Sequence, residues 1–421
     1  MSDKTDRGRL RLYGLPRNVI LLGVVSFLAD VSSEMVHPIL PIFMAGLGAT
    51  YLQIGLIEGL ADSIANFLKV TMGWYSDKVK RRKPFIAFGY APTAIMKPLL
   101  ALASSIEQVL GIRAIERAGK GIRTAPRDAL ITDSTPPEKR GVAFGLHRAL
   151  DSAGAIVGTA IALILIILVG VSSQMDTMRT IFVLSSIPAV ISVLVVIFFV
   201  KEPEAITKAV SRAKGFFASL KTIDPKLKRF LIVVSIIGFA NAGSTAGYYF
   251  FVLRAEDVLV NIEGVTETLA TILLLYIAMN ITYTAFSIPA GIVSDRIGRK
   301  PMIGIGLFVF VAAAVLMAFA NSTLVILFGF LLFGITLAIE EVNQRAYASQ
   351  LAVKTERGTV MGAYHTIVGF TALPAGLVFG FLWDSYGVVT AWLFAAVMAL
   401  LAFVFLTALV KESKGQDIAS S

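Results

Sequence analysis

The sequence of 421 residues is too apolar for a soluble protein. Hydrophobic residues make up 56% of the chain, charged residues 16%, and the mean hydropathy is +0.77. The apolar residues fall in runs of about twenty, the length of helix that crosses a hydrocarbon core of roughly 30 Å. These values argue against a soluble enzyme and predict an all-α membrane protein with many spanning helices.

The chain contains no cysteine, which excludes disulfides, thiolate metal sites and cysteine nucleophiles. Its three histidines, His37, His147 and His365, are far apart in the sequence and do not suggest a metal site. The formal net charge is +10, which can indicate either a nucleic-acid partner or the orientation of a membrane protein. The placement of the charges along the chain distinguishes these two interpretations.

Twelve apolar runs separated by polar breaks are predicted to span the membrane. The first run follows a basic tail of residues 1–17, is too long for a signal peptide and lacks a small-residue cleavage site, so we expect an uncleaved first span. The predicted spans, in chain order, are residues 18–44, 51–76, 84–104, 107–127, 141–170, 179–200, 229–253, 266–293, 302–320, 322–347, 358–383 and 388–410.

Most lysine and arginine residues lie in the two tails and in the connections after even-numbered spans. Only Arg254 and Arg179, which stands at the first position of span 6, lie on the outer side. Because basic loops stay in the cytoplasm, we expect a multi-pass protein of the cell membrane with both termini cytoplasmic. The positive charge is then an orientation signal, and we expect lipid, not nucleic acid, as the surrounding partner.

The segment 201–228 is the only long polar insertion between spans and contains Pro203, Pro225 and alternating charges. It predicts a cytoplasmic linker between an N-terminal six-helix lobe of residues 18–200 and a C-terminal six-helix lobe of residues 229–410. A short cytoplasmic tail, residues 411–421, would complete the chain.

The two predicted lobes are copies of one unit. Gly73-Trp-Tyr-Ser-Asp77-Lys-Val-Lys-Arg81-Arg82 returns as Gly291-Ile-Val-Ser-Asp295-Arg-Ile-Gly-Arg299-Lys300, each after the second span of its half. Arg127 and Arg345 occupy matching places after these loops. Such tandem similarity is typical of transporters built from parallel repeats.

This doubled loop, together with twelve spans, resembles the signature of the Major Facilitator Superfamily over about residues 18–410. Two further stretches resemble a poorly characterised group of prokaryotic transporters in that superfamily: Phe27-Leu-Ala-Asp30-Val-Ser-Ser-Glu34-Met-Val-His-Pro38 and Glu116-Arg117-Ala-Gly-Lys120-Gly121-Ile-Arg123-Thr-Ala-Pro126-Arg127-Asp128. The resemblance implies a secondary transporter of two pseudo-symmetric lobes. It also implies that the repeated loops stabilise the outward-facing state.

The loop residues suit a conformational latch. The glycines allow close approach of helices, and the aspartates can accept hydrogen bonds or pair with arginine only when the helix ends are together. The predicted latch residues are Gly73, Asp77, Arg81, Gly291, Asp295 and Arg299.

The predicted spans also contain acidic and basic residues in similar numbers. An unpaired charge at mid-membrane costs about 3 kcal/mol, so these groups must pair inside the bundle or face an aqueous cavity. A carboxylate in a poorly hydrated cavity near a movable arginine can bind and release a proton as the surroundings change. The residues assigned to proton coupling are Asp30, Glu34, Asp62 and Arg117.

An internal comparison supports this assignment for the first half. Opposite Asp30 and Glu34, the second half has Asn241 and Thr245, and it has Asn280 opposite Asp62. Packing alone does not require such an asymmetry of titratable groups. By resemblance, Arg117-Ala-Gly-Lys120-Gly121 matches the Arg-x-x-x-Gly motif linked to proton coupling, although the cations Lys120 and Arg123 depart from the usual neutral residues.

Other polar residues in the spans are assigned to a substrate cavity, although the tyrosines can equally be packing or interface residues. These residues are Glu58, Arg113, Lys120, Asp151, Asn241, Tyr248, Tyr249, Asn280 and Tyr283. Gly154 and Gly158 favour close helix packing, and also fit part of an antiporter pattern that lacks its expected proline. Glu340 and Glu341 are predicted to pair with Arg345.

No nucleotide-binding loop, cofactor motif or metal motif is present, so we expect a monomeric, non-enzymatic transporter driven by a gradient. Proton-coupled efflux of a small organic compound is the leading interpretation. Import or exchange of an organic anion is the alternative, motivated by the basic residues of spans 4 and 5. A membrane sensor without transport and an intramembrane hydrolase are the other classes, but neither an appended signalling domain nor a nucleophile–base motif is recognisable.

Overall fold

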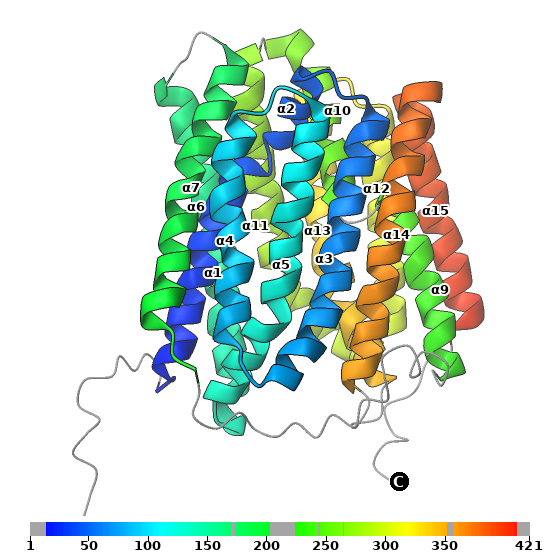
Figure 1. Ribbon diagram of the computed structural model, residues 1–421. Helices are drawn as coiled ribbons and strands as arrows, with labels where there is room; N and C mark the ends of the chain where they lie inside the picture. Colours follow the sequence, from blue (N-terminus) through cyan, green and yellow to red (C-terminus); the bar gives the residue numbers. More distant parts are fainter. Residues whose placement is uncertain are drawn as a thin grey trace, which may run out of the picture. The chain divides into compact units, whose positions relative to one another are not determined.

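A computed structural model describes residues 14–169, 173–202, 224–242, 245–263, 265–351 and 357–410 (Figure 1). Apart from one 3-10 turn, Pro137–Lys139, the regular elements in these ranges are α-helices. In chain order they are α1 (Arg17–Val36), α2 (Leu40–Gly46), α3 (Tyr51–Val79), α4 (Lys83–Ala101), α5 (Ile106–Ser134), α6 (Arg140–Val169), α7 (Gln174–Phe199), α9 (Pro225–Ala240), α10 (Thr245–Glu263), α11 (Val265–Ile297), α12 (Arg299–Ala318), α13 (Thr323–Gln350), α14 (Arg357–Tyr386) and α15 (Val388–Leu409).

These helices confirm the all-α fold and account for the twelve predicted spans. Span 1 is α1 followed by α2, span 7 is α9 followed by α10, and each remaining span is one helix. Eight of the described segments are long and apolar enough to cross a bilayer. Charged side chains lower the hydropathy of α3, α4 and α5, and the break between α9 and α10 divides span 7 into two shorter helices. The predicted linker lies largely outside the described residues.

Two spans are interrupted. Pro38 follows α1, and because proline lacks the amide proton of a regular helix, the chain turns before α2 begins at Leu40. In span 7, α9 ends at Ala240, and Ala242 adopts a left-handed conformation with φ +46°. That conformation is unusual for a residue with a side chain, which marks the α9–α10 break as locally strained.

Helix contacts divide the chain into two compact units. Unit 1 comprises residues 1–47 and 64–210, and unit 2 comprises residues 48–63 and 211–421. The boundary inside α3 assigns the first part of that helix to unit 2.

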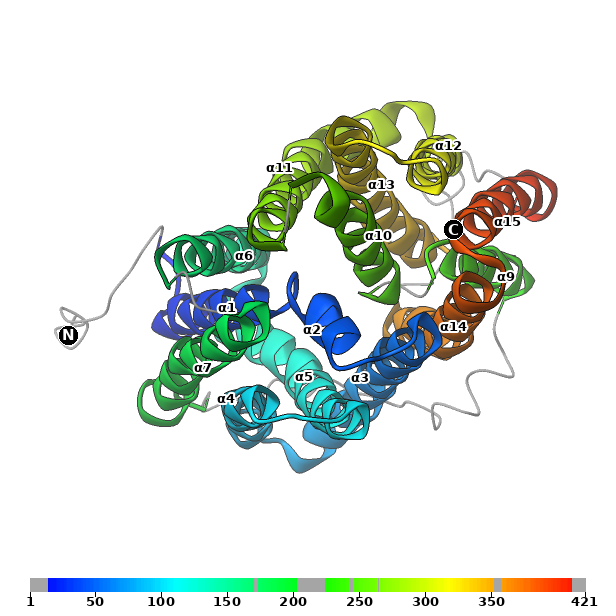
Figure 2. The same cartoon turned by 90° about the horizontal axis from the view of Figure 1, so that it is seen from above.

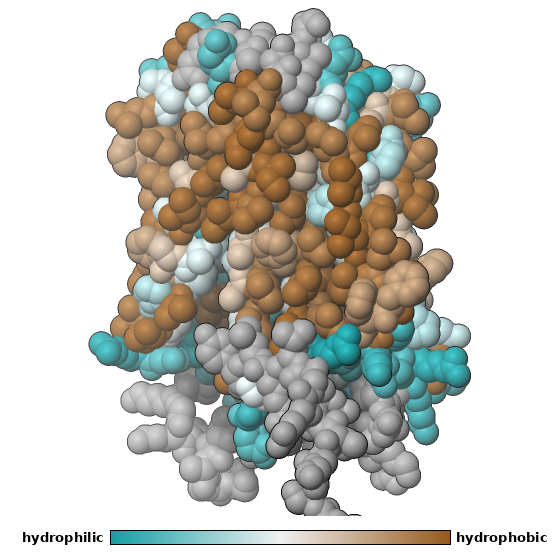
Figure 3. Space-filling view, turned by 90° about the vertical axis from the view of Figure 1, so that its left-hand side faces the viewer, coloured by the Kyte–Doolittle hydropathy of each residue, from teal (hydrophilic) through white to brown (hydrophobic). Residues whose placement is uncertain are grey.

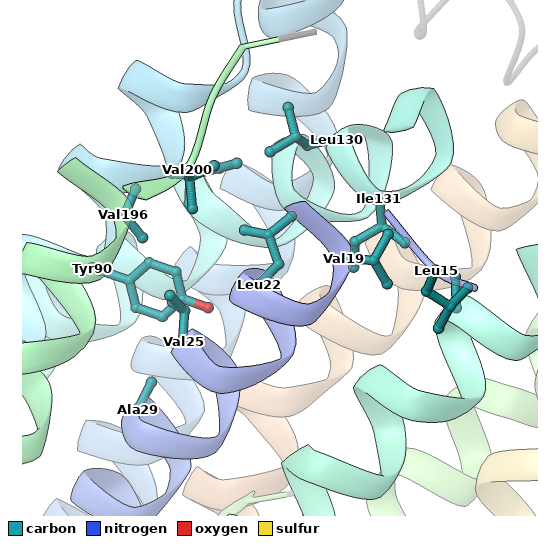
Figure 4. Packing of buried hydrophobic residues seen from close by; sticks show 12 residues of the cluster. Leu15, Val19, Leu22, Val25, Ala29, Tyr90, Leu130, Ile131, Val196 and Val200 are labelled. Atoms are coloured by element: carbon teal, nitrogen blue, oxygen red, sulfur yellow. The ribbon is translucent and has the colours of Figure 1, made fainter. Parts of the chain in front are cut away.

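In unit 1, α1 lies between α6 and α7, and α4 packs on α5 and α7 (Figure 2). A fully buried cluster joins these helices, with Leu22 and Val25 of α1 against Tyr90 of α4, Leu130 of α5 and Val196 of α7 (Figure 4). The apolar face of α1 therefore fixes the position of the polar residues that lie further along the same helix.

Unit 2 is held by helix pairs α12–α13, α11–α13 and α12–α15, and by α9 against α14 and α15. The first part of α3 docks on α14, where a Cβ added at Gly55 would lie 2.1 Å from the Gly376 carbonyl oxygen. Asp384 accepts hydrogen bonds from the amides of Tyr51 and Leu52, at 3.1 and 2.8 Å, and so caps α3. Backbone contact and capping together fix this seam.

Many large apolar side chains are exposed, as expected for a surface in contact with lipid. Leu168, Phe198 and Ile288 are 76%, 72% and 73% exposed. The face drawn in Figure 3 shows a broad hydrophobic band bordered by hydrophilic residues. A patch of this extent would aggregate in water but is stable in a bilayer, because lipid tails are as apolar as the side chains.

Candidate functional site

Two carboxyl groups meet inside unit 1. Asp30 of α1 and Asp151 of α6 are hydrogen-bonded to each other through their side chains. The close approach depends on α6: a Cβ at Gly154 would lie 2.5 Å from the Phe27 carbonyl oxygen, and one at Gly158 would lie 2.4 Å from that of Val31. The packing interpretation of these glycines is therefore confirmed. It also explains how two acidic residues from distant parts of the sequence come together.

Cations surround this carboxyl pair. Arg148 donates to Asp151 at 3.3 Å from the preceding turn of α6, and Lys120 of α5 is the cation whose charge bears most strongly on Asp30. Glu34, one turn beyond Asp30 on α1, adds a further negative charge. Arg117, assigned to modulate Asp30, acts on His37 at the end of α1.

A second polar cluster lies beside the carboxyl pair, and no site residue was assigned to it from the sequence. His147 of α6 is 2.8 Å from the Ser26 hydroxyl of α1, and Arg127 of α5 donates to the same hydroxyl at 3.0 Å. Arg127 also pairs with Asp128 at 3.1 Å. Two features of the sequence could have indicated this cluster, namely the matching positions of Arg127 and Arg345 and the presence of His147 within a span.

Two of the basic residues of α5 already have partners within unit 1. Arg113, 2% exposed, pairs with Glu116 at 2.5 Å. Arg123 lies over the ring of Tyr90, 4.3 Å from its centroid, and donates to the Gly89 carbonyl oxygen at 3.0 Å. These contacts compensate charges that the membrane interior would otherwise disfavour.

Glu58 and Asp62 are buried on the part of α3 that belongs to unit 2.

The polar residues assigned to the second half fall into separate groups within unit 2. Tyr248 packs on Tyr276, with ring centroids 4.7 Å apart, and the neighbouring Tyr249 is fully buried. Asn280 donates to the Tyr276 carbonyl oxygen at 3.0 Å, which makes it part of the helix packing of α11.

The adjacent acidic residues of α13 have different partners. Glu341 pairs with Arg345 at 3.1 Å, as predicted, and also accepts a hydrogen bond from Tyr283. The prediction for Glu340 was wrong: this residue accepts from Asn241 at 2.7 Å and from Gln344 at 3.3 Å. Consecutive residues on a helix point about 100° apart, so Glu340 faces the α9–α10 break while Glu341 faces α11.

Asn241 also lines a small cavity in unit 2. The cavity has room for about one water-sized group and is walled mainly by aromatic rings. Its lining residues are Ala240, Asn241, Ala242, Gly247, Phe251, Phe310, Phe333, Phe379 and Trp392. Of the residues assigned to a substrate cavity, Asn241 is the one that lines it.

In the first of the repeated loops, Asp77 pairs with Arg82 at 2.5 Å, whereas Arg81 is exposed. Arg82 is 4% exposed and lies 3.5 Å from Asp133 at the end of α5. Glu202 accepts hydrogen bonds from the amides of Arg82 and Lys83, at 2.6 and 3.0 Å, and so caps the start of α4.

In the second repeated loop, Asp295 pairs with Arg299, and Arg299 also donates to Asn343 of α13 at 3.3 Å. The glycines differ in packing. A Cβ at Gly73 would lie 3.1 Å from Ala125, whereas one at Gly291 would meet only Val342 at 3.9 Å. Within the described residues, no group of three or more histidine or acidic side chains is placed to hold a metal ion.

The model of the Major Facilitator Superfamily matches residues 22–279 and 258–420. An uncharacterised transporter of this type from Methanocaldococcus jannaschii is 39% identical over 397 residues, covering 93% of this chain and 94% of that protein. The multi-drug resistance efflux pump PmrA of Streptococcus pneumoniae is 28% identical over 71% of this chain and 72% of its own. The crystal structure of the nucleoside transporter NupG superposes with a TM-score of 0.77 at 16% identity, covering 94% of this chain and 99% of that chain.

Proposed function

The chain belongs to the Major Facilitator Superfamily and has its fold, and from this premise we propose that it exports a small organic compound in exchange for protons. The family membership makes it a membrane transporter and not an enzyme. Export is supported by the similarity to a multi-drug efflux pump over most of both chains. The lobes 18–200 and 229–410 rock about a cavity reached alternately from each side, with residues 201–228 connecting them in the cytoplasm.

The observation that carries the proton assignment is the hydrogen bond between Asp30 and Asp151. An ionised carboxylate is only an acceptor, so two carboxyl groups form this bond only when one of them holds a proton. Two like charges in such proximity inside a protein strongly disfavour joint ionisation. The pair is therefore a site for one exchangeable proton, and it titrates as a unit rather than as two separate acids.

Because of the surrounding charges, binding or loss of the proton changes the electrostatic forces between the helices. Loss of the proton places a second negative charge between α1 and α6, next to Arg148 and Lys120. Attraction to Lys120 then increases, which pulls α5 toward the pair, while repulsion between the two carboxylates acts to separate α1 from α6. Protonation reverses both forces. Glu34, Asp62 and Arg117 modulate this site in the proposal by changing the local charge.

The repeated loops act as latches within each half. Arg82 joins Asp77 to Asp133, and Arg299 joins Asp295 to Asn343, so each arginine ties helix ends together in one conformation. Because such contacts form only when the helix ends meet, breaking one shifts the conformational balance. The concentration of basic residues near these loops supports cytoplasmic termini in the cell membrane.

Exchange or import of an organic anion is the second candidate function. It draws on the basic residues of α5 and α6, of which Arg113 and Arg123 already bind protein groups. Arg113 is paired with Glu116, and Arg123 binds the Gly89 carbonyl oxygen and the Tyr90 ring. Fewer cationic groups are therefore available to bind an anionic substrate. We therefore prefer proton-coupled export by a monomer that binds a small molecule.

The experiment begins with a thermal-shift screen of the purified protein against metabolites and drugs. The compound that stabilises the protein most is then loaded into proteoliposomes, and its efflux is followed under an imposed pH gradient. The proposal predicts efflux that accelerates when protons can enter in exchange. Flux that is independent of the gradient would remove proton coupling, and gradient-driven uptake in the opposite direction would favour the second candidate.

Two variants and one control locate the coupling site. Asp30→Asn and Asp151→Asn should each abolish the response to the pH gradient while retaining binding of the stabilising compound. Asp176→Asn removes an exposed carboxylate at the start of α7 and should leave gradient-driven flux unchanged. Normal coupling in both Asp30 and Asp151 variants would refute the assigned role.

A further inference from the structure

The aromatic cavity of unit 2 is bordered by polar atoms that have no partner. Trp392, 1% exposed, has an indole nitrogen without a hydrogen-bond acceptor, and the side-chain oxygen of Asn241 has no donor. Both residues line the cavity. Leaving a buried polar group unsatisfied is unfavourable, so a ligand that supplies the missing partners is favoured on binding.

Glu340 makes the wall at Asn241 negative. Its side chain is 5% exposed, and the hydrogen bonds from Asn241 and Gln344 both go to Oε2. Oε1 has no partner, and no cationic side chain of the described residues compensates the carboxylate. Because a buried carboxylate without a counter-charge is costly, this group favours the arrival of a cation.

The end of α9 adds to this preference. Ala240 is the last residue of the helix, and Ala240, Asn241 and Ala242 all line the cavity. The final carbonyl groups of a helix lack intrahelical donors and carry partial negative charge. The part of the lining formed by Ala240, Asn241 and Ala242 therefore carries the C-terminus of α9 and a hydrogen bond to the Glu340 carboxylate.

The rest of the lining is largely aromatic, which selects among cations. Phe251, Phe333 and Trp392 pack around the cavity, with the Phe251 and Phe333 rings stacked at 4.2 Å. Ring faces attract cations, most strongly when water is excluded, and they supply no oxygen ligands for a metal. The space for about one water-sized group fits an ammonium head and excludes a bulky charged group.

We propose that this cavity binds the ammonium head of a small organic amine. The Asn241 side-chain oxygen accepts from the ammonium, Glu340 supplies negative charge next to Asn241, and the aromatic rings enclose the ammonium. The inference rests on the proposed transport function in one respect, namely that the amine is the transported compound.

Trp392 provides a direct readout of occupancy. The chain has three tryptophans, so Trp74→Phe combined with Trp383→Phe leaves Trp392 as the only indole fluorophore. Circular dichroism and thermal unfolding check that this double variant is folded. It is then titrated with n-butylammonium, with its isosteres n-butanol and butyrate, and with sodium chloride at constant ionic strength and pH.

The proposal predicts a saturable change in Trp392 fluorescence with butylammonium at a concentration at least about tenfold lower than with butanol, equivalent to about 1.4 kcal/mol. Butyrate should give no saturable change. Equal responses to butylammonium and butanol would overturn the proposal. So would a response to sodium alone that butylammonium does not displace, or a response to pH alone.

Charge variants add a second, independent test. Glu340→Gln should weaken butylammonium binding at least about tenfold, whereas Glu267→Gln, which removes an exposed carboxylate at the start of α11, should not. Unchanged binding in Glu340→Gln would also overturn the proposal. If that variant does not fold, the comparison of charged and neutral isosteres still decides.

The assay separates this inference from the transport proposal. Binding without proton-driven flux would leave the amine site standing and remove the coupling. Proton-coupled flux of another compound without amine binding would leave the transport proposal standing and remove the amine site.

Discussion

Gly154→Ala tests whether close packing of α1 and α6 creates the carboxyl pair. The added Cβ would lie 2.5 Å from the Phe27 carbonyl oxygen and 3.1 Å from the Asp30 Cβ. Ordinary contact needs about 3.5 Å, so α1 and α6 must separate by roughly 1 Å. A carboxyl–carboxyl hydrogen bond of about 2.7 Å would then lengthen to about 3.7 Å, which no longer counts as a hydrogen bond.

Two effects should follow in Gly154→Ala. Overpacking of this kind costs about 1–3 kcal/mol, which lowers the thermal unfolding temperature of the purified protein. Loss of the shared hydrogen bond should also weaken the response of flux to the pH gradient in proteoliposomes. The two readouts are independent, since stability reports packing and flux reports the pair.

Gly145→Ala is the matched control on the same helix. A Cβ there meets no atom within 4 Å, so the substitution removes a flexible residue from a helix without a clash. It should be neutral or stabilise by up to about 1 kcal/mol and leave coupling unchanged. If Gly154→Ala matched Gly145→Ala in both stability and coupling, the packing argument would be refuted.

Three further variants probe the helix ends. Arg82→Gln should lower the thermal unfolding temperature, because it leaves Asp77 and Asp133 without the cation beside them. Arg81 is exposed, so Arg81→Gln should leave the unfolding temperature unchanged. Equal effects of the two variants would contradict the latch contacts. Glu202→Ala should cost about 1 kcal/mol by removing the cap of α4, measured by thermal unfolding, and an unchanged midpoint would count against it. Arg254→Gln removes hydrogen bonds from Arg254 to the carbonyl oxygens of Met317 and Ala320, and so should weaken the contact of α10 with the end of α12. Amide hydrogen exchange near Ala320 should then be faster than in the wild type, and an unchanged rate would contradict this prediction.

The spans could be predicted from the sequence because bilayer thickness fixes the length of an apolar run. The break after α1 could also be predicted from the sequence, since Pro38 marks it. The break at Asn241 was not predicted, because no proline marks it, Gly243 is one of many glycines in the spans, and the residue with the positive φ is an alanine. Tertiary packing fixes that break.

The candidate site was predicted in its members but not in its pairing. Asp30 and Asp151 were both singled out, in different roles, and their contact depends on how closely Gly154 and Gly158 let two helices approach. Glu340 was assigned to Arg345 together with Glu341, because both acids lie toward the inner end of span 10. Its true partner, Asn241, lies on another helix, and no local spacing rule can reveal a contact of that kind.

The shared proton of the carboxyl pair can be observed by infrared difference spectroscopy of the reconstituted protein during a pH titration. The account predicts one protonated-carboxyl band that disappears in both Asp30→Asn and Asp151→Asn, since either change removes one half of the pair. A band that survives in both variants, or two bands that vanish separately, would contradict a single proton shared by these two residues.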